Sequence, residues 1–374
     1  MFSRSNIEKI KNELFQGRAI ILLGARQVGK TTLLKQLIED KENVLWLNAD
    51  EIAVRNLFEH FSVEKIKPII GNNKIVIIDE AQLIDDVGRC IKLIVDNVKE
   101  VQILATGSSA FELKNSMNEP LTGRKWEHQL FPLTFSEMAN KHGVFTEQQN
   151  LAQRLIFGSY PAVVNNPAQA QAVITELSES YLYKDLFMWG GLKKPDKIHT
   201  LLKALAYQVG SQVSYNELSQ IVQLDKETIE KYIEVLEQCF IVFRLNSFNK
   251  NLRNELKKSR KIYFFDNGVR NAILQDFRQV SLRDDIGALW ENYIVAEVWK
   301  KRKYENNYAK LYFWRTQTQQ EIDLLFEENT AMTAIEIKWN PKIKTKFNQL
   351  FIDAYQPKNT IVLHPENYSE YLLA

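Results

Sequence analysis

The chain has 374 residues, of which 45% are hydrophobic and 25% are charged, and a formal net charge of +2 at pH 7. This length exceeds what one hydrophobic core usually supports, so two or three domains are expected. No segment approaches the roughly 18 apolar residues of a membrane span, and the near-neutral charge excludes attraction of the whole chain to a polyanion. The N-terminal residues lack the apolar core of a signal peptide, so a cytoplasmic location is expected.

A phosphate-binding loop is predicted close to the N-terminus. An apolar run over residues 19–23 breaks at Gly24, and a helical pattern resumes after Lys30, which indicates a strand, a loop and a helix. The pattern G-x-x-x-x-G-K-[ST] lets backbone N–H groups surround phosphates, while the lysine adds a positive charge and the threonine binds Mg²⁺. The residues expected to bind the nucleotide are Gly24, Ala25, Arg26, Gln27, Val28, Gly29, Lys30, Thr31 and Thr32.

A second motif follows about fifty residues later, where the segment Lys74-Ile-Val-Ile-Ile-Asp-Glu-Ala81 reads as a buried strand that ends in two carboxylates. P-loop NTPases place such a pair beside Mg²⁺. Asp79 is expected to hold the metal and Glu80 to polarise the attacking water.

Five apolar runs alternate with helical stretches in the first third of the chain, at residues 19–23, 44–47, 75–78, 101–105 and 129–131. This alternation predicts a parallel sheet with helices on both faces, with ligands at the carboxyl ends of the strands. Residues 106–110 follow one of these strands. Thr106 or Ser108 could contact the γ-phosphate as a polar sensor, or this segment is a turn with helix-capping serines.

Several motifs together resemble a widespread prokaryotic group of AAA-type ATPases that carry a C-terminal domain of unknown function: the P-loop, IVIIDEAQ, LATGSSAFEL, LTGRKWEHQLFPLTFSE, YFFDNGVRN, ALWENYIVAEV and FWRTQTQQEIDLLF…AIEIKW. The resemblance implies an α/β ATPase domain over residues 1–136 that uses ATP and Mg²⁺. Related ATPases place a basic residue near a nucleotide where this chain has Arg124, so Arg124 is either a catalytic residue, in its own chain or in a homo-oligomer, or a surface arginine.

Residues 137–280 are expected to form a helical lid and a winged helix, because three helical patterns precede two strands, at 240–245 and 262–265. The apparent recognition helix, 226–237, presents mostly glutamates outward, so we expect it to pack on protein. Any duplex DNA contact would then come from the wing. Its basic residues are Lys250, Arg253, Lys257, Lys258, Arg260 and Lys261, opposed by Glu255 alone.

The C-terminal part, 281–374, begins with a helix over 288–301 and continues in three strands. Residues two apart in a strand share a face, so Glu336 and Lys338 point together, and Asp323 on the paired strand can join them. This constellation resembles the metal site of the PD-(D/E)XK nucleases, in which Lys338 would be catalytic. A helix glutamate would complete it, either Glu291, which the family pattern favours, or Glu297.

The sequence therefore predicts an ATPase that couples nucleotide turnover to DNA through a nuclease-like domain. Its metal ligands would be Thr31 and Asp79 at the nucleotide, and Glu291, Asp323 and Glu336 in the C-terminal part. A nucleotide-controlled switch is the alternative, in which ATP binding alters assembly with a partner and the nuclease-like fold only binds DNA or protein.

Overall fold

The computed structural model describes residues 1–374 apart from 109–120, 189–193, 249–258, 308, 317 and 344. It divides into two compact units. The first contains Met1–Phe131, Tyr181–Leu192 and Gln238–Phe240, and the second contains Pro132–Ser180, Lys193–Glu237 and Ile241–Ala374. The middle and C-terminal parts, expected to separate at residue 280, thus belong to one unit. In the described part of the chain, no helix is long and apolar enough to cross a bilayer.

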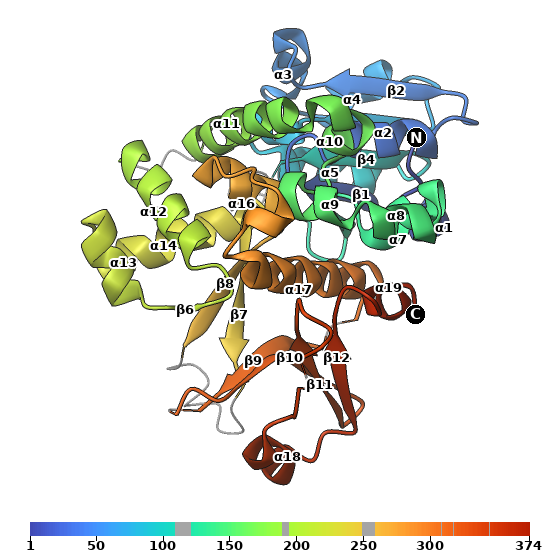
Figure 1. The fold of residues 1–374 in the computed structure, drawn as a ribbon. Helices are drawn as coiled ribbons and strands as arrows, with labels where there is room; N and C mark the ends of the chain where they lie inside the picture. Colours follow the sequence, from blue (N-terminus) through green and yellow to red (C-terminus); the bar gives the residue numbers. More distant parts are fainter. Residues whose placement is uncertain (109–120, 189–193, 249–258, 308, 317, 344) are drawn as a thin grey trace. The chain divides into compact units, whose positions relative to one another are not determined.

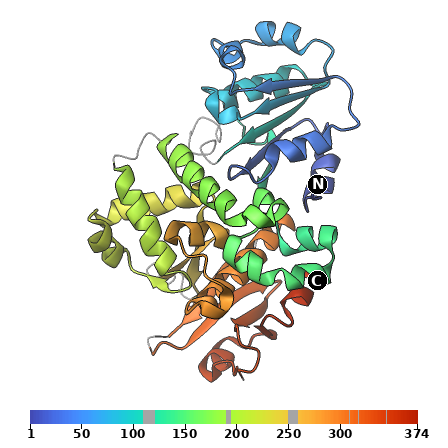
Figure 2. The ribbon, with the colours of Figure 1, turned by 45° about the horizontal axis from the view of Figure 1, so that its top comes forward.

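The first unit is built on a parallel five-stranded sheet in the order β2-β3-β4-β1-β5 (Figures 1 and 2). Its strands are β1 (Ala19–Gly24), β2 (Val44–Asn48), β3 (Ile75–Asp79), β4 (Gln102–Gly107) and β5 (Lys125–Leu130). Its helices are α1 (Ile7–Glu13), α2 (Lys30–Leu37), α3 (Ile52–Phe58), α4 (Val63–Ile70) and α5 (Val87–Asn97). The parallel α/β architecture predicted from the alternating runs is confirmed.

The strand order explains why helices cover both faces of this sheet. From β1 the chain crosses to β2 at the far edge and then returns strand by strand through β3 to β4. Because such crossovers are right-handed, the two directions of travel place α2 on one face and α4 and α5 on the other. Every residue of β1, β3 and β4 is buried, as their unbroken apolar runs predict.

The edge strand β5 is longer than the sequence pattern predicts, since only residues 129–131 were expected to be extended. It begins at Lys125 and pairs with β1 from Ala19↔Lys125 to Gly24↔Leu130. Only one side of an edge strand is paired, and Lys125, Trp126 and Glu127 are accordingly at least partly exposed. Because these residues are of mixed polarity and form no apolar run, the first half of β5 was not predicted from the sequence.

The second unit is organised around a mixed seven-stranded sheet in the order β12-β11-β10-β9-β7-β8-β6. Strands expected in two different domains meet in it, because β7 pairs with β9 at Asn246↔Tyr312 and Ser247↔Phe313. Its strands are β6 (Gln212–Val213), β7 (Val242–Ser247), β8 (Arg260–Phe264), β9 (Leu311–Arg315), β10 (Glu321–Glu328), β11 (Ala331–Ile337) and β12 (Asn359–Leu363).

The predicted winged helix is present as three helices followed by β7 and β8: α12 (Pro195–Tyr207), α13 (Tyr215–Val222) and α14 (Lys226–Gln238). The remaining helices are α7 (Phe135–His142), α8 (Val144–Gln149), α9 (Leu151–Phe157), α10 (Pro161–Asn165), α11 (Ala170–Met188), α16 (Asn267–Leu274), α17 (Ile286–Tyr304), α18 (Gln349–Tyr355) and α19 (Tyr368–Leu373). Helix α11 starts in the second unit, and its residues from Tyr181 onward belong to the first.

Helix α17 is the central helix of the second unit and lies along its sheet, in contact with β8 and β11 (Figure 1). It is buried on several sides: Leu289, Trp290 and Ile294 are fully inaccessible, and Glu297 and Lys300 are almost so. A helix that is buried on several sides lies in the core of its unit. It therefore fixes the positions of the charged residues that it carries.

Candidate functional site

The P-loop lies at the carboxyl end of β1, as predicted. Gly24 permits the close approach of β5, because a Cβ there would collide with the carbonyl of Leu130. Gly29 precedes helix α2 with φ of +100°, a conformation that favours glycine. The buried Lys30 ammonium donates to the loop carbonyls of Gly24 at 2.8 Å and Ala25 at 3.0 Å. The loop thus surrounds a cation at the N-terminus of a helix, where phosphate binds favourably.

A hydroxyl and carboxylate network continues from the loop across the sheet. The Thr31 hydroxyl lies 3.1 Å from Oδ2 of Asp79, which ends β3. On β4, the Thr106 hydroxyl donates to Oδ1 of Asp79 and accepts from the Glu80 N–H at 3.0 Å. These contacts bring together Thr31, Asp79 and Glu80, which sequence reasoning had assigned to the metal and the attacking water. They also give Thr106 a positioning role between the two acids.

Two further polar residues, Gln82 and Ser108, extend this network beyond Glu80. Gln82 donates from Nε2 to Oε2 of Glu80 at 2.5 Å and accepts from the Ser108 N–H at 3.3 Å. The buried Ser108 hydroxyl has no hydrogen-bond partner within the described residues. Of the two sensor candidates, Ser108 therefore has the spare hydroxyl, while that of Thr106 is engaged. Sequence reasoning missed Gln82, although IVIIDEAQ places it two residues after Glu80.

Arg124 lies at the amino ends of the strands of the first sheet, whereas the P-loop lies at their carboxyl ends. The register sets Lys125 beside Ala19 and Leu130 beside Gly24, so Arg124 precedes the amino end of β5. The six residues of β5 separate Arg124 from the P-loop along the strand direction, a distance of roughly 20 Å. Its Nε instead pairs with Oδ1 of Asp96 at 2.7 Å. The prediction that Arg124 contacts the nucleotide of its own chain is therefore wrong. In a parallel sheet, the amino ends of the strands lie on the side opposite their carboxyl ends, where the P-loop is.

The second unit contains an acidic cluster at the sheet beneath α17. Carboxylate oxygens of Glu291, Glu321 and Asp323 lie within 4.8 Å of one another. Asp323 stands opposite Glu336 by extension of the antiparallel register from Leu324↔Ile335. The structure therefore brings together the predicted Glu291, Asp323 and Glu336 and adds Glu321, which was not among the predicted site residues.

Three cations interleave with these acids. Lys261 Nζ pairs with Oε1 of Glu291 at 2.8 Å and also with Glu321. Lys338 Nζ lies 3.0 Å from Asp323 and 2.7 Å from Glu336. Arg315 pairs with Glu321 at 3.2 Å. With every group ionised, four carboxylates and three cations leave one net negative charge, so most of the acidic charge is compensated by the chain itself.

Burial and a neighbouring carboxylate raise the pKa of two acids of this cluster, Glu291 and Glu336. Desolvation raises the pKa of Glu291, although Lys261 beside it acts in the opposite direction. Desolvation and the charge of Asp323 raise the pKa of Glu336 to about 7. For Lys338, burial acts to lower the pKa, but Asp323 and Glu336 outweigh it and raise the pKa above its ordinary value. Such perturbed groups are common at functional sites and also in structural ion-pair networks.

The alternative helix residue, Glu297, lies elsewhere. It accepts the Phe135 N–H at 2.6 Å and the Lys300 ammonium at 3.0 Å, and it is nearly fully buried. It thereby holds the start of α7 rather than the acidic cluster. Glu291 and Glu297 lie six residues apart on α17, which places them on different faces of the helix. The structure resolves the choice in favour of Glu291.

The winged helix matches the expectation for its third helix. Ile229, Tyr232, Ile233 and Leu236 of α14 are buried, and its outward side chains are mainly glutamates. Among the wing cations, Lys250, Arg253, Lys257 and Lys258, with Glu255, lie outside the described residues. Lys261 was expected on the wing, but it is buried and paired with Glu291 and Glu321. Because its side chain points inward from β8, the prediction that Lys261 contacts DNA is wrong.

Family comparisons divide the chain into three consecutive matches. Residues 16–139 match an AAA domain, residues 148–280 match one domain of unknown function (DUF8612), and residues 286–372 match another (DUF4143). The first match and the geometry above agree that the first unit carries an AAA-type P-loop domain. The relation of residues 286–372 to PD-(D/E)XK nucleases stays a prediction.

Relatives and solved structures extend this picture. An uncharacterized protein of Mycobacterium tuberculosis is 24% identical, over 97% of this chain and 80% of its own length. An uncharacterized protein of Methanocaldococcus jannaschii is 26% identical, over 81% of this chain and 72% of its own. The Walker-type ATPase of Pyrococcus abyssi has a TM-score of 0.51 and 14% identity, covering 73% of this chain and 96% of that one. The last likeness concerns the fold.

Proposed function

We propose that the chain binds ATP with Mg²⁺ at the P-loop and hydrolyses it, and that turnover is coupled to DNA through the acidic cluster of the second unit. The observation that carries the first part is the network from Thr31 through Asp79 and Thr106 to Glu80, adjacent to Lys30. It places two acids and two hydroxyls at the carboxyl ends of neighbouring strands, where this fold binds its ligand.

The residues present fit a magnesium ion. The Thr31 hydroxyl and the Asp79 carboxylate are hard oxygen ligands 3.1 Å apart, and Mg²⁺ is usually held by one or two such groups and by phosphate oxygens. When bound, Mg²⁺ would neutralise charge on the phosphate oxygens. Lys30 would exchange its loop carbonyls for phosphate oxygens, and Glu80, held by Gln82, would orient the attacking water.

Loss of the lysine tests the nucleotide part. In Lys30→Ala the phosphate charge has no ammonium partner, so ATP affinity should fall at least about tenfold, the loss expected for one charge-assisted contact. Lys35→Ala, an exposed lysine of the same helix, should bind ATP like the parent chain. Titration calorimetry compares the two variants. Equal affinity in both would contradict nucleotide binding at this loop.

For the second unit, the proposal is that the acidic cluster binds Mg²⁺ or Mn²⁺ and, with Lys338, a DNA phosphate. Three carboxylates within 4.8 Å repel one another and are oxygen ligands of the kind these ions prefer. Manganese titration of the full chain should show a site that Asp323→Ala weakens, and Lys338→Ala should weaken DNA retention. Glu327→Ala, an exposed acid of the same strand, is the control. Unchanged binding in Asp323→Ala would contradict the site.

A second function is favoured by the charge balance of that cluster. Because Lys261, Lys338 and Arg315 already compensate most of its charge, the cluster can be stable without a cation, as a nucleotide-controlled switch would require. Turnover measured with and without duplex DNA separates the two functions. A coupled enzyme hydrolyses ATP faster when DNA is added, whereas a switch does not.

A further inference from the structure

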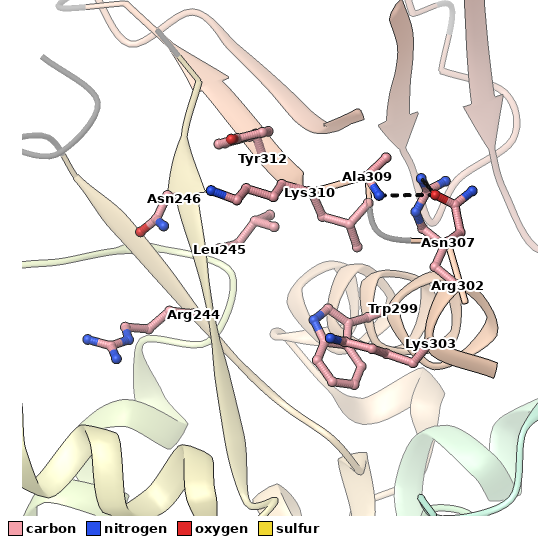
Figure 3. A pocket seen from close by; sticks show the side chains of 11 residues that line it. Arg244, Leu245, Asn246, Trp299, Arg302, Lys303, Asn307, Ala309, Lys310 and Tyr312 are labelled. Carbon is pink, nitrogen blue, oxygen red and sulfur yellow. Dashed lines mark hydrogen bonds between the residues drawn. The ribbon is translucent and has the colours of Figure 1, made fainter. Parts of the chain in front are cut away.

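A pocket of about 240 Å³ lies in the second unit between β7, β9 and the end of α17 (Figure 3). Its described lining contains no acidic residue, whereas Arg302, Lys303 and Lys310 supply positive charge. Asn246 and Tyr312 add neutral polar groups. The pocket contains none of the residues assigned above to nucleotide, metal or DNA.

Two lysines are the exposed cations of this pocket. Lys310 extends from the start of β9 toward Asn246, and Lys303 projects from α17 beside Trp299 (Figure 3), with its ammonium 5.0 Å from the Trp299 ring centroid. Both lysines are exposed. Arg244 also lines the pocket, but its guanidinium points away in Figure 3 and pairs with Glu237. Within the described part of the chain no carboxylate pairs with Lys303 or Lys310, so these two lysines supply the uncompensated positive charge.

Arg302 is the fixed cation of the pocket. Its side chain is buried, with an exposed fraction of 9%. Its Nη2 donates to Asn307 at 2.8 Å and pairs with Glu328 at 2.6 Å, and its guanidinium lies 4.0 Å above the Phe326 ring. Within the described residues, its Nε–H has no acceptor. A buried donor without an acceptor is unfavourable, and an acceptor oxygen of a ligand in the pocket would satisfy it.

We propose that this pocket binds a phosphate group. Phosphate offers several acceptor oxygens and negative charge, which suits a lining of ammonium and guanidinium donors. The carboxyl end of α17 carries about half a negative charge, which opposes an anion. The two full charges of Lys303 and Lys310 outweigh it. The phosphate belongs either to a small free molecule or to the backbone of a nucleic-acid strand, and both present the same group.

The test uses the full chain in a Lys30→Ala background, so that the P-loop lysine does not contribute. One arm titrates inorganic pyrophosphate by calorimetry, and the other titrates a labelled single-stranded oligonucleotide by fluorescence anisotropy. The pocket variant Lys303→Ala/Lys310→Ala is compared with the charge-matched Lys203→Ala/Lys231→Ala, whose exposed lysines lie on α12 and α14. Lys303→Arg/Lys310→Arg keeps the charge and should keep the binding.

We expect the pocket variant to bind about tenfold more weakly than the charge-matched control, because two charge-assisted contacts are lost, each weakened by the exposure of its lysine to solvent. Weakening in the pyrophosphate arm identifies a free phosphate compound as a ligand. Weakening in the oligonucleotide arm alone identifies the backbone of a strand, and its affinity should then fall as salt rises. The proposal is overturned if the pocket variant and the control bind both probes equally, or if neither probe binds the parent chain. ATP turnover does not enter this test.

Discussion

The environment of Glu336 makes the folding stability of the protein depend on pH. Burial and Asp323 raise the pKa of Glu336 from 4.5 to about 7. Between those values the folded chain retains a proton that the unfolded chain has released, so stability falls as pH rises through this window. The full loss of folding stability is reached above the pKa of Glu336 in the folded chain, where its carboxyl group is ionised.

Glu336→Gln should remove that dependence, because the amide resembles the protonated acid. We expect the melting temperature of the parent chain to drop more than that of the variant between about pH 5 and about pH 8, measured with a chelator present. Glu327→Gln, on the exposed part of β10, should follow the parent chain. Parallel pH profiles for all three proteins would contradict the raised pKa of Glu336.

Several single residues were predictable because their motifs fix backbone position. Lys30, Asp79 and Glu80 follow from the spacing of a loop and a strand, and the structure brings them together. Glu321 could have been found, since it lies two residues from Asp323 on one strand and so shares its face. Lys261 could not, because its inward direction depends on β8 pairing with β7 within a larger sheet. A basic residue near a loop resembles a surface charge until that pairing is known.

The junction between α9 and α16 depends on a glycine. A Cβ on Gly268 would collide with the carbonyl of Phe157 and approach Asp266 Oδ1 at 2.9 Å. Asp266 itself is buried and accepts from the Ser159 N–H at 2.7 Å and the Val269 N–H at 3.2 Å. The Asp266 carboxylate cannot move without losing these hydrogen bonds, and the Phe157 carbonyl is part of the backbone, so this packing tolerates no side chain.

Gly268→Ala should therefore destabilise the protein by about 2 kcal/mol, within the range for overpacking. Gly287 is also helical, but a Cβ there meets nothing within 4 Å. Gly287→Ala should be neutral or stabilise by up to about 1 kcal/mol, since alanine is the better helix former. Denaturant unfolding measures both variants. A Gly268→Ala protein as stable as Gly287→Ala would show that the α9–α16 junction can adjust.

At the level of elements, the apolar runs predicted the central strands well, because buried parallel strands leave an unbroken hydrophobic signature. The edge strand β5 was recognised only in part, since its first residues are half exposed. The pairing of β7 with β9 was not predicted at all. It joins strands more than sixty residues apart through few residues, and no local pattern encodes such a contact.

The whole molecule raises the question of whether Arg124 acts on a neighbouring chain. Its place at the edge opposite the P-loop leaves only a role across a subunit interface, as a homo-oligomer would provide. If it has that role, ATP turnover per chain should rise with protein concentration, and Arg124→Ala should abolish the rise. Asp96→Ala removes the partner of Arg124 but leaves the arginine, so it should retain the rise. Turnover that is independent of concentration would leave Arg124 a surface residue.

Hydrolysis of ATP by the P-loop unit, as proposed above, depends on Glu80 orienting the water. The most direct measurement compares steady-state ATP turnover and ATP retention in the parent chain and in Glu80→Gln. The amide keeps the shape of the side chain and its place beside Gln82 but cannot act on the water as a carboxylate does. We predict that Glu80→Gln binds ATP with unchanged affinity, retains it and turns over at least about a hundredfold more slowly, the usual contribution of such a group. Turnover at the parental rate in Glu80→Gln would contradict the role of Glu80 in orienting the attacking water.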